Sequence, residues 1–281
     1  MGNEEYTFEL HNWLSLLSRF RDKPIPSNIY RQVNTHYMHY WLNDRLSQIS
    51  GGNEFLRALP RQIKRSIVVH FLFDDVFYNF RFFFNPQKYK DSKFLYDVAF
   101  GLVPRTYSDK EEENIIYDEE DEVLEMYFIT KGTVGVGFHT YQQPLEEKPF
   151  NITHQLNLHS FFGDYYILSN TKAEFVHIAQ TPVEAFALSR KFLVGKVFPK
   201  YPEIYEDMCQ QSSDRYHHIV KAEVQTHKQT HIETVNKCAS YSNIQIDKKD
   251  EVMDMSHLRM MSQIIPKVKG DFGAQRIREQ F

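Results

Sequence analysis

The sequence predicts an α+β fold in which helices come first, an antiparallel β-roll of the jelly-roll type follows, and further helices flank the roll. Apolar residues recur at helical spacing through residues 8–45, and helical periodicity returns in residues 190–236. Between them, from about residue 107, short apolar segments alternate with turn residues, as in small antiparallel rolls. We therefore expect a helical part at residues 1–93, a roll with its helices at 94–236, and a polar tail with a short amphipathic helix at 237–281.

Prolines divide the helical parts. Pro24 and Pro26 separate two helices near the N-terminus, and Pro60 stands where the first turn of another helix is expected. Pro202 divides residues 190–236 into a short helix and a long one. Three or four helices are thus expected before any strand.

The strands of the roll are expected where short apolar segments are bounded by turn residues. The segments are Ile115–Tyr117, Met126–Ile129, Val134–Phe138, Ile152–Leu156, Phe175–Ala179 and Ala185–Leu188.

Composition narrows the class of protein. The net charge of −4, with basic residues scattered along the chain, gives no nucleic-acid-binding surface. Cys209 and Cys238 are far apart and lack CxxC spacing, which favours a reduced, cytosolic chain. No apolar run approaches the eighteen or so residues of a membrane helix. Glu4 and Glu5 stand where a signal peptide would carry basic residues, so we expect no signal peptide.

Catalytic and metal-binding motifs are absent from the sequence. GxSxG, P-loop, HExxH and GxGxxG patterns do not occur, so we expect no enzyme. Glu223, His227 and His231 share one helix face at a spacing that zinc accepts. Exposed helix faces commonly collect such polar residues, and we expect no metal site.

Two motifs point to a known family. The segment 125–132 reads as a buried strand that runs into a turn at Gly132, and Phe161-Phe162-Gly163-Asp164 follows some thirty residues later. This order resembles the β-roll of the cyclic-nucleotide-binding domain family. Residues 23–29 and 55–60 are similar to the helical C-linker of hyperpolarization-activated, cyclic-nucleotide-gated and ether-à-go-go-type channels.

The resemblance covers roughly residues 8–236 and implies the gating module of a potassium or other cation channel. It implies a homotetramer formed through the C-linker, a membrane-embedded pore domain in the same polypeptide, and a location on the cytoplasmic side of a membrane. The alternative is a soluble cyclic-nucleotide-binding or scaffold protein without a pore.

The resemblance also assigns a ligand site for cAMP or cGMP. Asp164 matches the carboxylate that contacts the ribose, and Arg215 and Ile219 match two positions that face the base.

The phosphate side departs from the family. Where the family places an arginine and then a threonine or serine, an ungapped count gives Ala173 and Glu174. At an effective dielectric constant near 20, two negative charges about 4 Å apart repel by roughly 4 kcal/mol. Lys172 stands beside these positions, and a one-residue shift would make it a substitute phosphate contact, without the two-pronged geometry of arginine. We therefore expect the pocket to be degenerate and ordinary high-affinity binding of cAMP or cGMP to be lost.

Two further interpretations stay open. In ether-à-go-go-type channels a tyrosine after the roll fills the nucleotide pocket as a built-in ligand, and Tyr216 is a candidate for this role; the alternative is a plain buried helix position. The methionines within residues 253–265 are typical of faces that bind calmodulin-like partners, although a short helix packed on its own domain would carry them as well.

Overall fold

The computed structural model describes residues 2–20, 23–46, 58–85, 92–110, 114–140 and 150–233. The described residues up to 227 belong to one compact unit. The predicted amphipathic tail segment, Cys238 and the first half of the linker motif at residues 55–60 lie outside the described residues.

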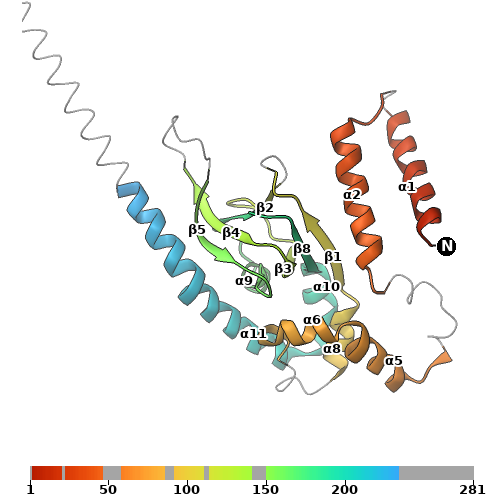
Figure 1. Ribbon diagram of the computed structural model, residues 1–281. Coiled ribbons are helices and arrows are strands. Elements are labelled where there is room, and N and C mark those ends of the chain that lie inside the picture. Colours follow the sequence, from red (N-terminus) through yellow and green to blue (C-terminus); the bar gives the residue numbers. More distant parts are fainter. Residues whose placement is uncertain are drawn as a thin grey trace, which may run out of the picture. The chain divides into compact units, whose positions relative to one another are not determined.

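Helices make up the first part of the chain, as the periodicity predicts. α1 and α2 form a hairpin (Figure 1) across the two prolines. Shorter helices follow and lead to the first strand. The helices are α1 (Gly2–Arg19), α2 (Ser27–Asn43), α5 (Arg61–Ile67), the π-helix η1 (Val68–Leu72), α6 (Asp74–Asn79), α7 (Arg81–Phe84) and α8 (Ser92–Ala99).

Eight strands form two antiparallel sheets of four strands each in the part of the chain that the structure describes. The first sheet has the order β1-β8-β3-β6 and the second the order β2-β7-β4-β5. The strands are β1 (Leu102–Tyr107), β2 (Ile115–Tyr117), β3 (Glu125–Lys131), β4 (Val134–His139), β5 (Phe150–Leu156), β6 (Phe161–Phe162), β7 (Val176–Ala179) and β8 (Val183–Ser189). The α+β class is confirmed.

All six predicted strands are present, and two more were not predicted. β1 contains Pro104, which has no backbone N–H and argues against a strand in the sequence. The strand nevertheless forms because it lies at the edge of its sheet and pairs only with β8. β6 is two residues long and pairs Phe161 and Phe162 with β3, too short for a periodicity argument.

An aromatic cluster joins the helices to the first sheet. Phe80, Phe83 and Phe84 are buried and pack around Phe128 of β3, with ring centroids 5.0 to 5.2 Å from it. Phe83 also contacts Phe161, at 5.3 Å between centroids. The aromatic run at residues 80–84 therefore serves mainly as core packing between helix and sheet.

Helices also follow the strands. A short helix, α9 (Asp164–Ser169), lies between β6 and β7. After β8 come α10 (Arg190–Phe192), the π-helix η2 (Leu193–Val197), the 3₁₀-helix η3 (Phe198–Lys200), α11 (Pro202–Arg215) and the π-helix η4 (Tyr216–Lys221). Helical backbone continues over residues 222–233. No helix among the described residues is long and apolar enough to cross a membrane.

Candidate functional site

The Phe-Gly-Asp turn places a carboxylate at the start of α9. Gly163 has φ of 88°, a left-handed conformation that favours glycine. A Cβ atom there would collide with the hydroxyl of Tyr117 and press on the backbone of Met126. Only glycine fits this tight turn, which aims Asp164 at α11.

Asp164 is bound by two side chains of α11. Its own side chain is 3% exposed. The Ser212 hydroxyl donates a hydrogen bond of 2.6 Å to one carboxylate oxygen, and the Arg215 guanidinium forms an ion pair with the other. A buried carboxylate needs such partners, because an unpaired charge away from water is strongly destabilising.

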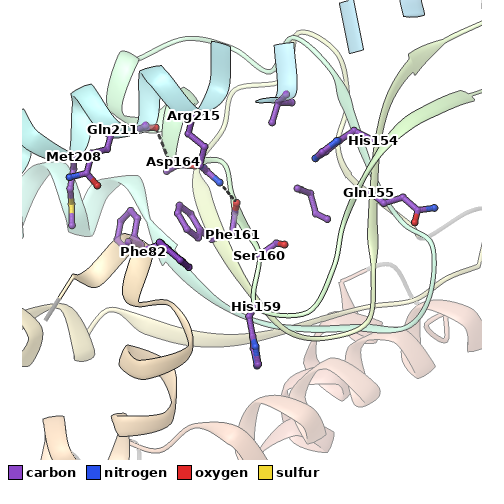
Figure 2. A pocket seen from close by; sticks show the side chains of 14 residues that line it. Phe82, His154, Gln155, His159, Ser160, Phe161, Asp164, Met208, Gln211 and Arg215 are labelled. Atoms are coloured by element: carbon purple, nitrogen blue, oxygen red, sulfur yellow. Dashed lines mark hydrogen bonds and ion pairs between the residues drawn. The ribbon is translucent and has the colours of Figure 1, made fainter. Parts of the chain in front are cut away.

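Arg215 has three contacts around this pair. Besides Asp164, it donates a hydrogen bond of 2.9 Å to the backbone oxygen of Phe161. Its guanidinium carbon lies 4.0 Å from the centroid of the Phe161 ring, a cation–π geometry. Figure 2 shows Asp164, Arg215 and Phe161 together. The structure thus brings two predicted ligand residues, Asp164 and Arg215, together and pairs them with each other.

Tyr216 is buried beside this pair and is 5% exposed. Its ring stacks on that of Tyr165, with centroids 3.9 Å apart and an interplanar angle of 4°. Its hydroxyl lies 3.1 Å from the hydroxyl of Tyr166. Burial raises the pKa of Tyr216, and the neighbouring Tyr166 and Glu174 raise it further, so the phenol stays neutral.

The predicted phosphate-side residues lie in the segment before β7. Ala173 is 1% exposed; its N–H donates to the backbone oxygen of Asp121 and its own oxygen accepts from the N–H of Glu120. Glu174 pairs with Lys221 of η4, at 3.0 Å between nitrogen and oxygen. Lys172 is 64% exposed and lies 4.0 Å from a carboxylate oxygen of Glu120.

Of the three residues predicted for the phosphate side, Ala173 is therefore enclosed and Glu174 is paired, whereas Lys172 is largely exposed. Ala173, where the resemblance places an arginine, is fully buried, and the negative charge of Glu174 is offset within the chain. The side chain of Ile219, the third residue predicted to face the base, lies outside what the structure describes.

Two histidines take part that the sequence did not single out. His177 of β7 is 3% exposed, stacks on Phe162 with centroids 5.2 Å apart, and lies 3.0 Å from the backbone oxygen of Phe175. Burial lowers the pKa of His177 to about 4. The ring of His154 in β5 lies 2.7 Å from the carboxylate of Glu223. A lone histidine in an apolar strand is the only sequence signal for the first, and none exists for the second.

The zinc alternative finds no support in the geometry. Glu223 faces His154 rather than a second helix histidine. Among the residues that the structure describes, no three His, Cys, Asp or Glu side chains lie close enough together to hold a metal ion.

Two cavities adjoin the Asp164–Arg215 pair. The first, next to Tyr165, Tyr216 and His177, has a volume of about 20 Å³. A water molecule needs at least roughly 10–15 Å³ of such volume, so this cavity has room for about one. The second, bounded by α7, β5 and α11, has a volume of about 490 Å³. Lys172, Ala173 and Glu174 line neither cavity.

The π-helix η4 keeps one face of the C-terminal helix against the sheets. The buried or partly buried residues of this stripe occur at every fourth position: Met208, Ser212, Tyr216, Val220 and Val224. In an α-helix, four residues advance by about 400°, so such a stripe drifts by about 40° at each step. The wider turns of a π-helix advance less per residue and offset this drift.

Comparison with models of known protein families gives no match to this chain. Comparison with curated protein sequences gives no match either.

Proposed function

We propose that this chain is the regulatory module of a tetrameric, voltage- or cyclic-nucleotide-gated cation channel, with a C-linker of helices and a jelly-roll-like β-roll. In this proposal the nucleotide pocket is degenerate, and the chain's own C-terminal helix fills it. The order of helices, two four-stranded antiparallel sheets and helices supports it, as does the Phe-Gly-Asp turn.

The observation that carries the proposal is the burial of Tyr216 on Tyr165. The ring of Tyr216 lies beside the predicted ribose carboxylate and leaves a cavity of only about 20 Å³. Ligand sites for small molecules commonly have volumes of about 300–1,000 Å³. Tyr216 therefore acts as the built-in ligand, and a nucleotide would have to displace it.

The hydrogen-bonding groups of the pocket are occupied as well. Asp164 accepts from Ser212 and Arg215, and Glu174 pairs with Lys221. A ribose or phosphate would have to break these contacts, and each group left unpaired would cost free energy. The module consequently works without a nucleotide.

Helix docking would reach the linker through Phe161. The Arg215 guanidinium lies over the Phe161 ring, and Phe83 of α7 packs against the same ring. Release of the C-terminal helix removes Arg215 from Phe161 and thereby changes the packing of the linker aromatics. A signal acts on such a two-state element only through its different affinity for the docked and released states.

The first test is calorimetric titration of the chain with cAMP and with cGMP. We expect no binding to the unaltered protein or to Glu174→Gln, because removing the charge leaves the space filled. Tyr216→Ala should gain weak binding, whereas Tyr216→Phe, which keeps the ring, should not. Micromolar binding by the unaltered protein would overturn the built-in ligand.

The second test addresses the channel. The full-length gene product is expressed in oocytes, and voltage-activated cation currents are recorded with and without millimolar cAMP. We expect currents that do not respond to cAMP and whose half-activation voltage shifts in Tyr216→Ala but not in Tyr216→Phe. A full-length product that carries no cation current at any voltage would contradict the channel proposal and favour a soluble binding or scaffold protein.

A further inference from the structure

The larger cavity has the features of a ligand site of its own. Its volume of about 490 Å³ lies within the usual range for small-molecule sites. Phe82, Phe83 and Phe161 supply aromatic surface, and Met208 supplies an adaptable apolar side chain. Figure 2 shows Phe82, Phe161 and Met208, with Arg215 next to Phe161.

Arg215 lines this cavity and has one donor without a partner in the part of the chain that the structure describes. Two of its nitrogens are engaged by Asp164 and by the Phe161 backbone oxygen. Its third nitrogen, Nε, is buried and has no hydrogen-bond partner among the described residues. A buried N–H without an acceptor costs about 1–3 kcal/mol, so an oxygen acceptor placed there by a ligand would recover that cost.

The same contacts argue against a nucleotide in this cavity. Each carboxylate oxygen of Asp164 already accepts one hydrogen bond, so the hydroxyls of a sugar would compete with Ser212 and Arg215 for this carboxylate. Arg215 and His154, which line the cavity, already face the carboxylates of Asp164 and Glu223. A strongly charged anion would therefore have to compete with Asp164 for the Arg215 guanidinium.

We propose that the cavity between α7, β5 and α11 binds a flat, uncharged aromatic molecule that carries one oxygen acceptor. The ring lies against Phe82, Phe83 and Phe161, and the oxygen accepts from Nε of Arg215. Because the ligand contacts both α7 and α11, its binding holds the C-terminal helix against α7. The site is independent of the proposed channel function.

The test uses the fluorescent naphthyl ketone prodan, which is flat, neutral and carries a single carbonyl acceptor. Prodan is titrated into protein labelled with ¹³C at the methionine methyl groups, and emission and methyl spectra are recorded together. Met208 lines the cavity, whereas Met126 lies in the core of the sheet. We expect saturable binding that shifts the Met208 signal and leaves that of Met126 in place.

A matched pair of variants locates the site. Phe82 lines the cavity and is 77% exposed, and Tyr78 is 66% exposed but does not line it. Arg81 lies over both rings. Since both side chains are exposed, neither Phe82→Ala nor Tyr78→Ala should unfold the protein.

Phe82→Ala should weaken prodan binding by about tenfold, and Tyr78→Ala should leave it unchanged. The proposal would be overturned if prodan does not bind saturably, or if it binds without shifting the Met208 signal. It would also be overturned if the two variants lose the same amount of affinity for prodan. Nucleotide binding by Tyr216→Ala is read separately, so failure here and failure of the built-in ligand are distinguishable.

Discussion

The ring of Tyr216 lies parallel to that of Tyr165, with centroids 3.9 Å apart, and joins the C-terminal helix to the helix that begins at Asp164. The two rings come from segments about fifty residues apart in sequence. This contact fills the space beside the Phe-Gly-Asp turn. Substitutions of Tyr216 can therefore be used to measure how strongly η4 packs there.

Removing the Tyr216 ring should destabilise the protein strongly. Tyr216→Ala loses a buried ring and its stack, for which we expect a decrease in the free energy of unfolding of about 3–4 kcal/mol. Tyr216→Phe keeps the ring and loses the contacts of the hydroxyl with Tyr166 and Glu174, so it should cost about 1–2 kcal/mol. Urea unfolding followed by circular dichroism measures both, and equal costs would show that the hydroxyl matters more than the ring.

Replacing Arg215 of the Asp164–Arg215 pair should lower the free energy of unfolding by more than the loss of a surface ion pair does. Arg215→Met leaves a carboxylate that is 3% exposed with Ser212 as its remaining side-chain partner, and we expect a loss of about 3 kcal/mol. Asp164→Asn in the Arg215→Met background removes the stranded charge and should restore part of the loss. A double-mutant cycle should give a coupling of at least about 1 kcal/mol. Strict additivity would mean that the two side chains do not interact.

Burial of His177 should make the protein less stable in mild acid. Its pKa is about 4 in the folded chain against the ordinary 6.5, so between these values the unfolded chain binds a proton that the folded chain does not. Stability is therefore fully present above pH 6.5 and falls as the pH drops towards 4. The full effect corresponds to about 3 kcal/mol.

The control for this pH dependence is a second histidine. His177→Phe should flatten the fall in unfolding free energy between pH 6.5 and 4, whereas His227→Phe, at an exposed helix position, should leave it unchanged. The same slope in both variants would assign the pH dependence to other groups.

Deleting one residue should convert η4 into a regular α-helix. With His218 removed, Tyr216, Val220 and Val224 stand at spacings of three and four, which is the natural stripe of an α-helix. We expect the deletion to keep the helix docked and to raise the melting temperature by about 2–4 °C.

A deletion upstream of the π-helix tests the same idea in the opposite direction. Removing Ser213 rotates Arg215 and Tyr216 away from their partners, so the melting temperature should fall. Differential scanning calorimetry compares the two deletions. If both deletions lower the melting temperature equally, the π-helix does not align the buried stripe.

Periodicity in the sequence was sufficient for most of the fold but not for its exceptions. The six predicted strands follow from short apolar segments between turns. β1 was missed because Pro104 argues against a strand, and only the position of the strand at a sheet edge removes the objection. The π-helices also could not be predicted from local sequence patterns, because the geometry of η4 depends on the surface against which the helix packs.

The candidate site was predicted as a set of residue types, not as a set of contacts. Asp164 and Arg215 were both singled out, each as a ligand contact. Their pairing with each other depends on how α11 crosses α9, which no local pattern specifies. Glu174 was read as a charge facing a phosphate, and its partner Lys221 lies forty-seven residues further along the chain.

The edge strands of the two sheets influence whether copies of this chain aggregate. An exposed strand edge can recruit a strand from another molecule and start aggregation. Here β6 has two residues, β2 has three, and β1 carries a proline that cannot donate a backbone hydrogen bond. β5, with seven residues, is the remaining edge, and His154 on it pairs with Glu223 of the C-terminal helix. Release of that helix would therefore break this contact at the longest edge strand among the described residues, so variants that loosen the helix should aggregate before they unfold.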